Sequence, residues 1–233
     1  MSRQIPLPFG FNPEHGFEEF YPGGNAEAVA HLRRAALGQS PEPLIFLWGE
    51  TGLGKTHLLH AYCREAHRAG RAVSYLPLRV LQEYGGEVLE GLEEQDAVCL
   101  DDLQAVIGDA EWEQALFNLF NRLRDAGQSL VVAADAPPDA LEVLLPDLQT
   151  RLGWGLTLLL RPLDDAGKLA ALRLRARLLG LDVSPAVGRF LMGNYRRDLP
   201  GLMELLALLD RATLAAKRKL TIPFLKTLLE ETP

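Results

Sequence analysis

The sequence of 233 residues predicts an α/β fold with a parallel sheet, followed by a smaller all-α domain. Three observations lead to this expectation. A glycine-rich loop with a phosphate-binding pattern follows an apolar run and precedes a helical pattern. Short, continuous apolar runs then alternate with helical patterns, as in a parallel sheet that is covered by helices on both faces. After Arg161-Pro162 the pattern becomes almost wholly helical, which predicts a second domain.

Each expected strand is a short apolar run, and each expected helix is a longer amphipathic segment beside such a run. The strands are expected at Pro43–Trp48, Ala72–Pro77, Ala97–Leu100, Leu130–Ala134 and Leu156–Leu160. The helices are expected at Asn25–Leu37, His57–Ala69, Arg79–Leu92, Trp112–Ala126 and Ala140–Leu148. From Asp164 to Glu231, glycines and prolines divide a helical segment whose leucine and alanine stripes predict the core of a bundle.

The composition excludes several classes of protein. Hydrophobic residues make up 48% of the chain, no apolar run approaches the length of a membrane span, and the N-terminus has no secretory signal. We therefore expect a cytoplasmic protein that does not enter a membrane.

Cys63 and Cys99 are expected to be reduced core residues rather than a disulfide or a metal site. The formal net charge of −7 argues against DNA binding as the main activity, although a local basic patch could lie under an acidic total.

The phosphate-binding loop matches the full G-x-x-x-x-G-K-[ST] pattern. Its glycines allow backbone N–H groups to surround phosphate oxygens. Lys55 is expected to reach the outer phosphates, and the hydroxyl of Thr56 is expected to bind Mg²⁺. The helix that starts at His57 adds the positive end of its dipole. We therefore expect a bound nucleoside phosphate, held by Gly49, Glu50, Thr51, Gly52, Leu53, Gly54, Lys55, Thr56 and His57.

Two carboxylates follow the expected strand Ala97–Leu100. In phosphate-loop NTPases, an acidic residue at a strand end holds Mg²⁺, and a neighbouring carboxylate can polarise the attacking water. We assign Asp101 to the Mg²⁺ shell and Asp102 to the orientation of water. An Asp-Asp pair also caps turns and helices, but a position about fifty residues after the loop, on an apolar strand, favours the catalytic assignment.

Three motifs resemble the AAA+ domain of the bacterial replication initiator DnaA. They are Gly52-Leu53-Gly54-Lys55-Thr56-His57-Leu58-Leu59-His60-Ala61, Leu100-Asp101-Asp102-Leu103-Gln104 and Arg151-Leu152-Gly153-Trp154-Gly155-Leu156, in the family order. Phe20-Tyr21-Pro22-Gly23-Gly24-Asn25 and the N-terminal arm are closer to the Hda group, DnaA homologues that inactivate the initiator. The resemblance implies an AAA+ P-loop NTPase module with a five-stranded parallel sheet, helices on both faces, and a helical lid. The implied parts are an extended arm at 1–14, the nucleotide-binding domain at 15–161 and the lid at 162–233.

The resemblance also implies roles for further polar residues. Asp135 matches the sensor 1 position, which senses the γ-phosphate or holds the water, although an Asp in front of a proline pair also suits a turn. Arg197 matches the sensor 2 arginine of the lid, and a solvated Arg-Arg pair is the alternative. Arg151 matches the arginine finger, which in AAA+ proteins faces the nucleotide of a neighbouring subunit. The implied catalytic residues are therefore Asp102, Asp135 and Arg151.

The implied cofactors are ADP or ATP, with Mg²⁺. The resemblance places Phe20 and Tyr21, together with Phe17, over the adenine base, while packing of the first helix is an equal use for the same rings. No zinc site is expected, because His57 and His60 lie on one helix without further ligands.

The N-terminal arm contains Gln4-Ile5-Pro6-Leu7-Pro8-Phe9, which resembles the pattern by which bacterial proteins dock on the sliding clamp of DNA polymerase III. Gln4 would bond the rim of the clamp pocket, while Leu7 and Phe9 would fill an apolar slot. The prolines would hold the peptide extended and so reduce the entropy lost on docking. A packed or disordered terminus would account for the same residues.

The segment between the second and third expected strands is acidic, where DnaA uses a basic surface to bind single-stranded DNA. A row of carboxylates would repel the phosphate backbone of DNA. The other interpretation of these glutamates is a solvated helix face, which equally excludes DNA binding. The residues are Glu83, Glu87, Glu90, Glu93 and Glu94, with Arg79 as the nearby cation.

These features favour a regulator of the Hda type. Docked on the sliding clamp (the β subunit) and holding ADP, it would present Arg151 to the ATP bound by DnaA, and hydrolysis would leave the initiator in its inactive ADP form. Its own ATPase would be weak and its direct DNA binding weak or absent, and a homodimer is a further assembly to consider. The alternative is a helicase loader or DnaA-like adaptor driven by its own ATP turnover, and a third is an ordinary self-assembling ATPase.

Overall fold

The computed structural model describes residues 15–195, 198–216, 222–223 and 225. Contacts divide the chain into two units. The first consists of the residues up to Phe17 together with Asn25–Arg161, and the second consists of Glu18–Gly24 together with the residues from Pro162 onward. The segment Glu18–Gly24 thus packs with the helical unit, although it precedes the first helix of the sheet unit in sequence. Gly23 lies so close to the side chain of Leu163 that a Cβ at this position would clash.

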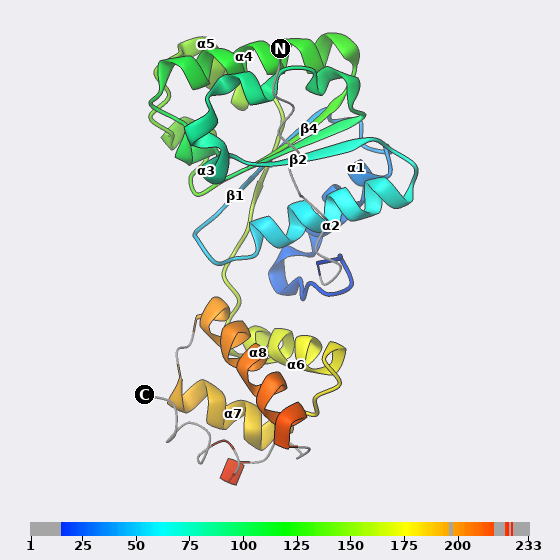
Figure 1. Ribbon diagram of the computed structural model, residues 1–233, viewed down its shortest axis with the longest axis vertical. Coiled ribbons are helices and arrows are strands. Elements are labelled where there is room, and N and C mark those ends of the chain that lie inside the picture. The colour runs from blue at the N-terminus through cyan, green and yellow to red at the C-terminus, as the bar shows by residue number, and fades with distance from the viewer. Residues whose placement is uncertain (1–14, 196–197, 217–221, 224, 226–233) are drawn as a thin grey trace. The chain divides into compact units, whose positions relative to one another are not determined.

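The first unit is built on a five-stranded parallel sheet (Figure 1). The strand order is β2-β3-β4-β1-β5, and every pairing is parallel. The strands are β1 (Leu44–Trp48), β2 (Val73–Pro77), β3 (Ala97–Asp101), β4 (Ser129–Ala134) and β5 (Leu156–Leu159). The predicted sheet is confirmed, because every strand begins and ends within one residue of its expected bounds. β3 is buried along its whole length, which explains why its apolar run is continuous rather than alternating.

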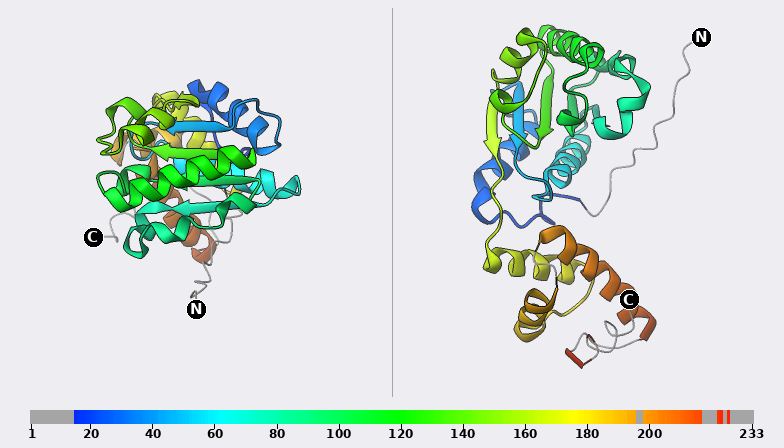
Figure 2. Two further views of the ribbon diagram at one scale, coloured as in Figure 1. Left: turned by 90° about the horizontal axis from the view of Figure 1, so that it is seen from above. Right: turned by 90° about the vertical axis from the view of Figure 1, so that its left-hand side faces the viewer.

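Helices cover both faces of the sheet, as Figures 1 and 2 show. α1 (Ala26–Ala36) and α2 (Lys55–Arg68) pack together on one face, and α4 (Ala110–Ala126) and α5 (Pro146–Leu152) pack together on the other. α4 begins where the side chain of Asp109 accepts hydrogen bonds from two backbone N–H groups of its first turn. It ends at Gly127, whose φ of +71° suits a helix C-terminus.

The predicted helix Arg79–Leu92 is wrong. The chain forms a single helical turn, α3 (Leu78–Leu81), and then three 3₁₀ turns. Gly85 and Gly91 interrupt the helix, since their φ values of +77° and +76° lie in the left-handed region that glycine adopts readily. Gly86 lies against Ala115 of α4 so closely that no Cβ would fit there. These 3₁₀ turns are η2 (Gln82–Tyr84), η3 (Gly86–Leu89) and η4 (Leu92–Glu94), and those elsewhere in the described residues are η1 (Gly23–Asn25), η5 (Leu103–Ala105) and η6 (Pro138–Ala140).

The predicted helix Ala140–Leu148 is also misplaced. α5 begins at Pro146, because proline suits the first helical position, where no N–H donor is needed. The segment before it forms only the turn η6. As a consequence, Arg151 lies in the last turn of α5 rather than after a helix.

The second unit is helical. Its helices are α6 (Asp165–Leu178), α7 (Pro185–Asn194) and α8 (Leu199–Ala216). The side chain of Asp164 caps α6 by accepting a hydrogen bond from Gly167 N at 2.7 Å, and Ser184 caps α7 in the same way. The predicted bundle core is confirmed by a cluster of buried side chains that includes Leu172, Leu191, Leu202, Leu206 and Leu209.

One buried residue joins the point where the chain returns to the sheet unit, at Asn25, to the point where it leaves that unit, at Arg161. The side chain of Asn25, which is 4% exposed, donates to Arg161 O at 3.0 Å and accepts from Arg161 N at 2.8 Å. Cys63 and Cys99 are free and buried, which confirms the expectation of core residues. Among the residues that the structure describes, no helix is long and apolar enough to cross a membrane.

Candidate functional site

The polar residues expected to handle a nucleotide meet at the carboxyl edge of the sheet. The phosphate loop leaves β1, Asp101 and Asp102 lie at the end of β3, and Asp135 follows β4. These three strands are neighbours, so their carboxyl ends lie together, which is where ligands bind in open α/β sheets. Burial lowers the pKa of Lys55, and the nearby charges of Asp101, Asp135 and Asp102 oppose that shift. The four side chains therefore belong to one site.

The loop itself has the geometry of an anion-binding turn. Gly49, Gly52 and Gly54 have φ values of +153°, +85° and +94°. A Cβ at Gly49 would lie 2.7 Å from Leu160 O, so only glycine fits at that position. Lys55 is 7% exposed, and its Nζ donates to Gly49 O at 2.6 Å and to Glu50 O at 3.0 Å. A buried ammonium within a glycine turn at the start of α2 fits a phosphate group.

Asp101 is held by a residue that the sequence analysis missed. It is 2% exposed, and its Oδ2 accepts a hydrogen bond from the Tyr75 hydroxyl at 2.9 Å. Its Oδ1 accepts from Asp102 N at 3.0 Å. Burial, together with the charge of Asp101, raises the pKa of the Tyr75 hydroxyl, so that this group remains a hydrogen-bond donor. The pairing of β2 with β3 could have suggested this contact, because Tyr75 is directly opposite Cys99, two residues before Asp101.

Asp102 is also engaged by protein groups. Its backbone is left-handed, with a φ of +56°, which is unusual for a residue other than glycine and is typical of functional sites. Its Oδ2 accepts from Arg79 Nε at 3.1 Å, and its Oδ1 accepts from Gln104 Nε2 at 3.0 Å. Both carboxylate oxygens therefore have donors in place of the water that Asp102 is expected to orient.

We predict that Arg79→Ala increases the chain's own ATP hydrolysis by about two- to five-fold. The Arg79 side chain is 60% exposed, so its ion pair with Asp102 is worth at most about 1 kcal/mol, which limits the effect. Steady-state hydrolysis in the absence of any partner measures it, with ADP affinity as the control for an intact loop. An unchanged or lower rate would show that Arg79 does not restrain Asp102.

Arg151 lies at the other edge of the sheet. It lies in the last turn of α5 and precedes β5, and Gly155 packs directly against Leu44 at the start of β1. Arg151 is therefore at the amino edge, whereas the phosphate loop leaves the carboxyl edge of the same sheet. Five strand residues at about 3.3 Å each separate the two edges by about 16 Å.

The guanidinium of Arg151 lies over two aromatic rings. Its Cζ is 4.7 Å from the centroid of Phe117 and 4.9 Å from the centroid of Trp154. Within the described part of the chain, it has no acidic partner. Phe117 was not among the residues expected from the sequence, and Trp154 was part of the Arg151–Leu156 motif without an assigned role.

The aromatic residues before α1 are divided between the two units. Phe17 is 6% exposed and lies under the guanidinium of Arg33, which is the core-packing use that the sequence left open. Phe20 and Tyr21 are half-buried in the segment that packs with the helical unit. The ring of His57 donates from Nε2 to Gly16 O at 2.8 Å, so its side chain fixes the chain before Phe17. Gln4, Leu7, Phe9 and Arg197 lie outside the described residues.

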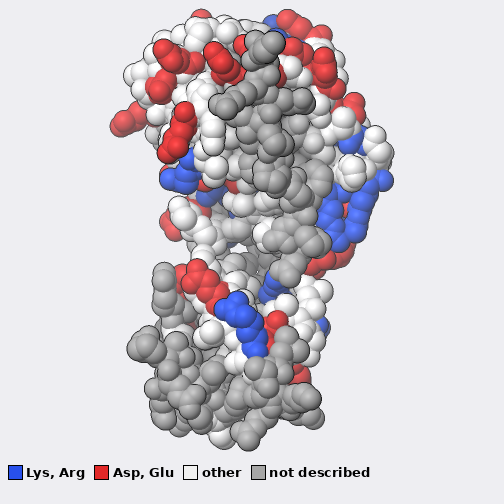
Figure 3. Space-filling model, in the orientation of Figure 1, with Lys and Arg blue, Asp and Glu red and all other residues white. Residues whose placement is uncertain are grey.

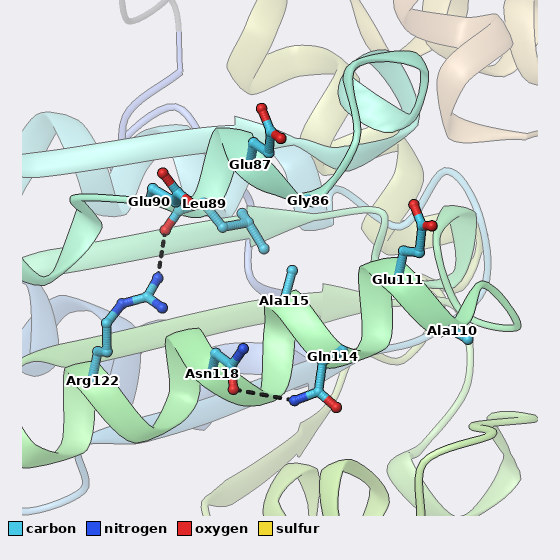
Figure 4. A pocket seen from close by; sticks show the side chains of 10 residues that line it. All are labelled: Gly86, Glu87, Leu89, Glu90, Ala110, Glu111, Gln114, Ala115, Asn118 and Arg122. Atoms are coloured by element: carbon cyan, nitrogen blue, oxygen red, sulfur yellow. Dashed lines mark hydrogen bonds between the residues drawn. The ribbon is translucent and has the colours of Figure 1, made fainter. Parts of the chain in front are cut away.

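The segment between β2 and β3 is acidic, as predicted, although it consists of turns. Glu93 pairs with Arg122 at 3.0 Å, and the other four glutamates are exposed. Glu87, Glu90 and Glu111 line a hollow of about 480 Å³ between η3 and α4 (Figure 4). Figure 3 shows acidic side chains gathered over the end of the sheet unit that carries α4.

The sheet order, the phosphate loop after β1, the carboxylates after β3 and the helical C-terminal unit define an AAA+ P-loop NTPase fold. A model of the bacterial DnaA ATPase domain matches residues 11–159, and a model of the Hda lid domain matches residues 165–229. The chain therefore belongs to the bacterial DnaA ATPase-domain family and carries a lid of the Hda type.

Solved structures agree with this assignment. Domain III of the replication initiation protein DnaA from Thermotoga maritima is 25% identical, with a TM-score of 0.80, over 95% of this chain and 99% of that one. DnaA from Aquifex aeolicus bound to AMPPCP is also 25% identical, with a TM-score of 0.70, over 85% of this chain and 66% of that one. The RuvB branch migration motor of T. maritima, at 18% identity and a TM-score of 0.65 over 92% of this chain and 72% of that one, shares the fold alone. The resemblance to DnaA is thus confirmed, and the chain is a DnaA-like, replication-related protein.

Proposed function

We propose that the chain regulates replication initiation by stimulating hydrolysis of the ATP bound to DnaA. One observation carries this proposal: Arg151 and the chain's own phosphate loop lie at opposite edges of the sheet. A guanidinium at the amino edge would contact the phosphate of a nucleotide that is bound to another molecule. An arginine supplied in trans to a phosphoryl-transfer site neutralises charge that develops in the transition state.

The chain's own nucleotide, ADP or ATP, has a structural role in this account. We assign the phosphates to Lys55 and the loop residues Gly49 to Thr56, and the adenine to Phe20 and Tyr21. Arg197, which lies outside the described residues, is assigned to the phosphates by its match to the sensor 2 arginine. The AMPPCP bound by the A. aeolicus relative supports an adenine nucleotide. Thr56, exposed on the first turn of α2, and the buried Asp101 would hold Mg²⁺, which neutralises phosphate charge when bound.

Two features support weak hydrolysis at the chain's own site. The oxygens of Asp102 accept hydrogen bonds from Arg79 and Gln104, so that water must displace a protein donor to reach them. Arg151 is too far from the loop to contribute there. Asp135 remains exposed at the end of β4 and would contact the γ-phosphate or its water.

The proposed partners are DnaA and the DNA polymerase III sliding clamp, with the arm residues Gln4, Leu7 and Phe9 as the contact to the clamp. Direct binding to DNA would be weak or absent, because exposed glutamates cover the segment between β2 and β3. Docking on the clamp would deliver the chain to replicated DNA without a DNA-binding surface of its own.

We expect Gln4→Ala combined with Leu7→Ala to weaken clamp binding by about 10- to 50-fold, because both residues would act as anchors in a short docked peptide. Surface plasmon resonance on immobilised clamp measures the affinity. The control is the melting temperature, which should stay the same. Clamp binding at full strength would contradict the prediction, and a large fall in melting temperature would favour a packed arm.

The test of the proposal is the nucleotide carried by DnaA after incubation with this chain and DNA-loaded clamp. The alternative, a helicase loader or adaptor driven by its own turnover, predicts rapid hydrolysis of free ATP without DnaA. It also predicts that DnaA keeps its ATP. The acidic segment gives no support to that alternative, since a protein that works on DNA directly usually has a basic face.

A further inference from the structure

The guanidinium of Arg151 lies over two aromatic rings. Phe117 lies on α4 and Trp154 follows α5, so two separate elements supply the rings. Stacking of a guanidinium on an aromatic face is a favourable cation–π geometry, and Trp is the best of the aromatic partners. Trp154 is 60% exposed, whereas Trp side chains are highly buried on average.

The backbone around Arg151 is built to hold these rings in place. Trp154 N donates to Arg151 O at 3.0 Å, which folds the chain back over the end of α5. The start of α5 is fixed by Glu113, which is 0% exposed and accepts from Leu144 N at 3.0 Å and from Leu145 N at 2.7 Å. Glu113 lies one helical turn before Phe117 on α4. The same helix thus sets the position of α5 and supplies one of the rings.

The guanidinium of Arg151 remains available to a ligand. It has aromatic neighbours but no acidic partner in the part of the chain that the structure describes. Its fork of N–H donors matches the oxygens of a phosphate or carboxylate.

We propose that Trp154 and Phe117 are positioning residues that hold the Arg151 side chain in place for the phosphate of a neighbouring AAA+ module. This inference rests on the proposed function, which gives Arg151 its target. A free arginine loses much rotamer freedom when it is fixed in a transition state. The two rings impose that restriction beforehand, so that their contribution appears in the rate of hydrolysis.

Two readouts test this proposal. In NMR spectra, the δ-methylene and Nε–H protons of Arg151 should be shifted upfield by the rings, and Trp154→Ala should remove most of that shift without any partner present. In the hydrolysis assay with DnaA, Trp154→Ala should lower the maximal stimulated rate by about 3- to 30-fold, with little change in the half-saturating concentration. Trp154→Phe should restore most of both, because it keeps a ring over the guanidinium. Tyr84→Ala, which removes another exposed aromatic side chain, is the matched control and should change neither.

The outcomes separate this inference from the function on which it rests. Wild-type resonances without an upfield shift, or full stimulation by Trp154→Ala, would overturn the positioning role while Arg151→Ala still abolishes stimulation. Full stimulation by Arg151→Ala would overturn the proposed function and this inference with it.

Discussion

Replacing Arg151 with alanine should lower the stimulated hydrolysis of DnaA-bound ATP by about 10³-fold or more. The guanidinium would neutralise charge that appears only in the transition state. Its loss should therefore raise the activation barrier by several kcal/mol, which lowers the rate by a factor on the order of 10³. The rate is measured with DnaA preloaded with radiolabelled ATP, in the presence of DNA-loaded clamp and either variant.

The control for this prediction is Arg34→Ala, which removes an exposed arginine from α1 on the other face of the sheet. It should stimulate as well as the wild type. The Arg151→Ala protein should keep its own ADP affinity and its clamp binding. Full stimulation by this variant would remove Arg151 from the mechanism, and loss of its own nucleotide binding would mean that Arg151 acts in cis.

Replacing Lys55 with alanine should weaken binding of ADP and ATP by about 10²-fold or more. The change removes the buried cation of the phosphate loop, and charge-assisted bonds to phosphate are among the strongest hydrogen bonds in proteins. Isothermal titration calorimetry with each nucleotide measures the loss.

Arg68→Ala is the matched control, because Arg68 is an exposed cation at the far end of the same helix. It should bind nucleotide normally. The thermal unfolding of Lys55→Ala in the absence of nucleotide should be compared with that of the wild type, since Lys55 also bonds the loop carbonyls. Unchanged affinity in a folded Lys55→Ala protein would show that the loop does not hold the phosphates.

The sheet was predictable from the sequence because its strands are local, continuous apolar runs. The same holds for the phosphate loop, whose glycines and Lys55 form one short string. The order of the strands then determined which ends meet, and so it placed Asp101, Asp102 and Asp135 around Lys55. The segment after β2 was mispredicted, because Gly85 and Gly91 act through their backbone conformation, which overrides a helical pattern of side chains.

The contacts that complete the site were not predictable in the same way. Tyr75 meets Asp101, Arg79 meets Asp102, and Phe117 meets Arg151 across different elements. Each of these pairs depends on strand register or on the packing of elements that are distant in sequence, neither of which a local pattern contains. Trp154 is an exception, because it is three residues from Arg151 and a turn brings it over the guanidinium.

The two edges of the sheet have different roles in the proposed function. Its carboxyl edge holds the chain's own nucleotide, and its amino edge presents Arg151 to another molecule. This separation is why the loss of Lys55 and the loss of Arg151 should give different defects, one in binding and one in catalysis on the partner.

The most direct test of the account is the conversion of DnaA-bound ATP to ADP in a single round. DnaA is loaded with ATP labelled at the α-phosphate, freed of unbound nucleotide, and mixed with this chain in the presence or absence of clamp on DNA. We expect rapid conversion only when the chain and the loaded clamp are both present. Conversion at the same slow rate with and without the chain, while the chain hydrolyses free ATP rapidly, would contradict it.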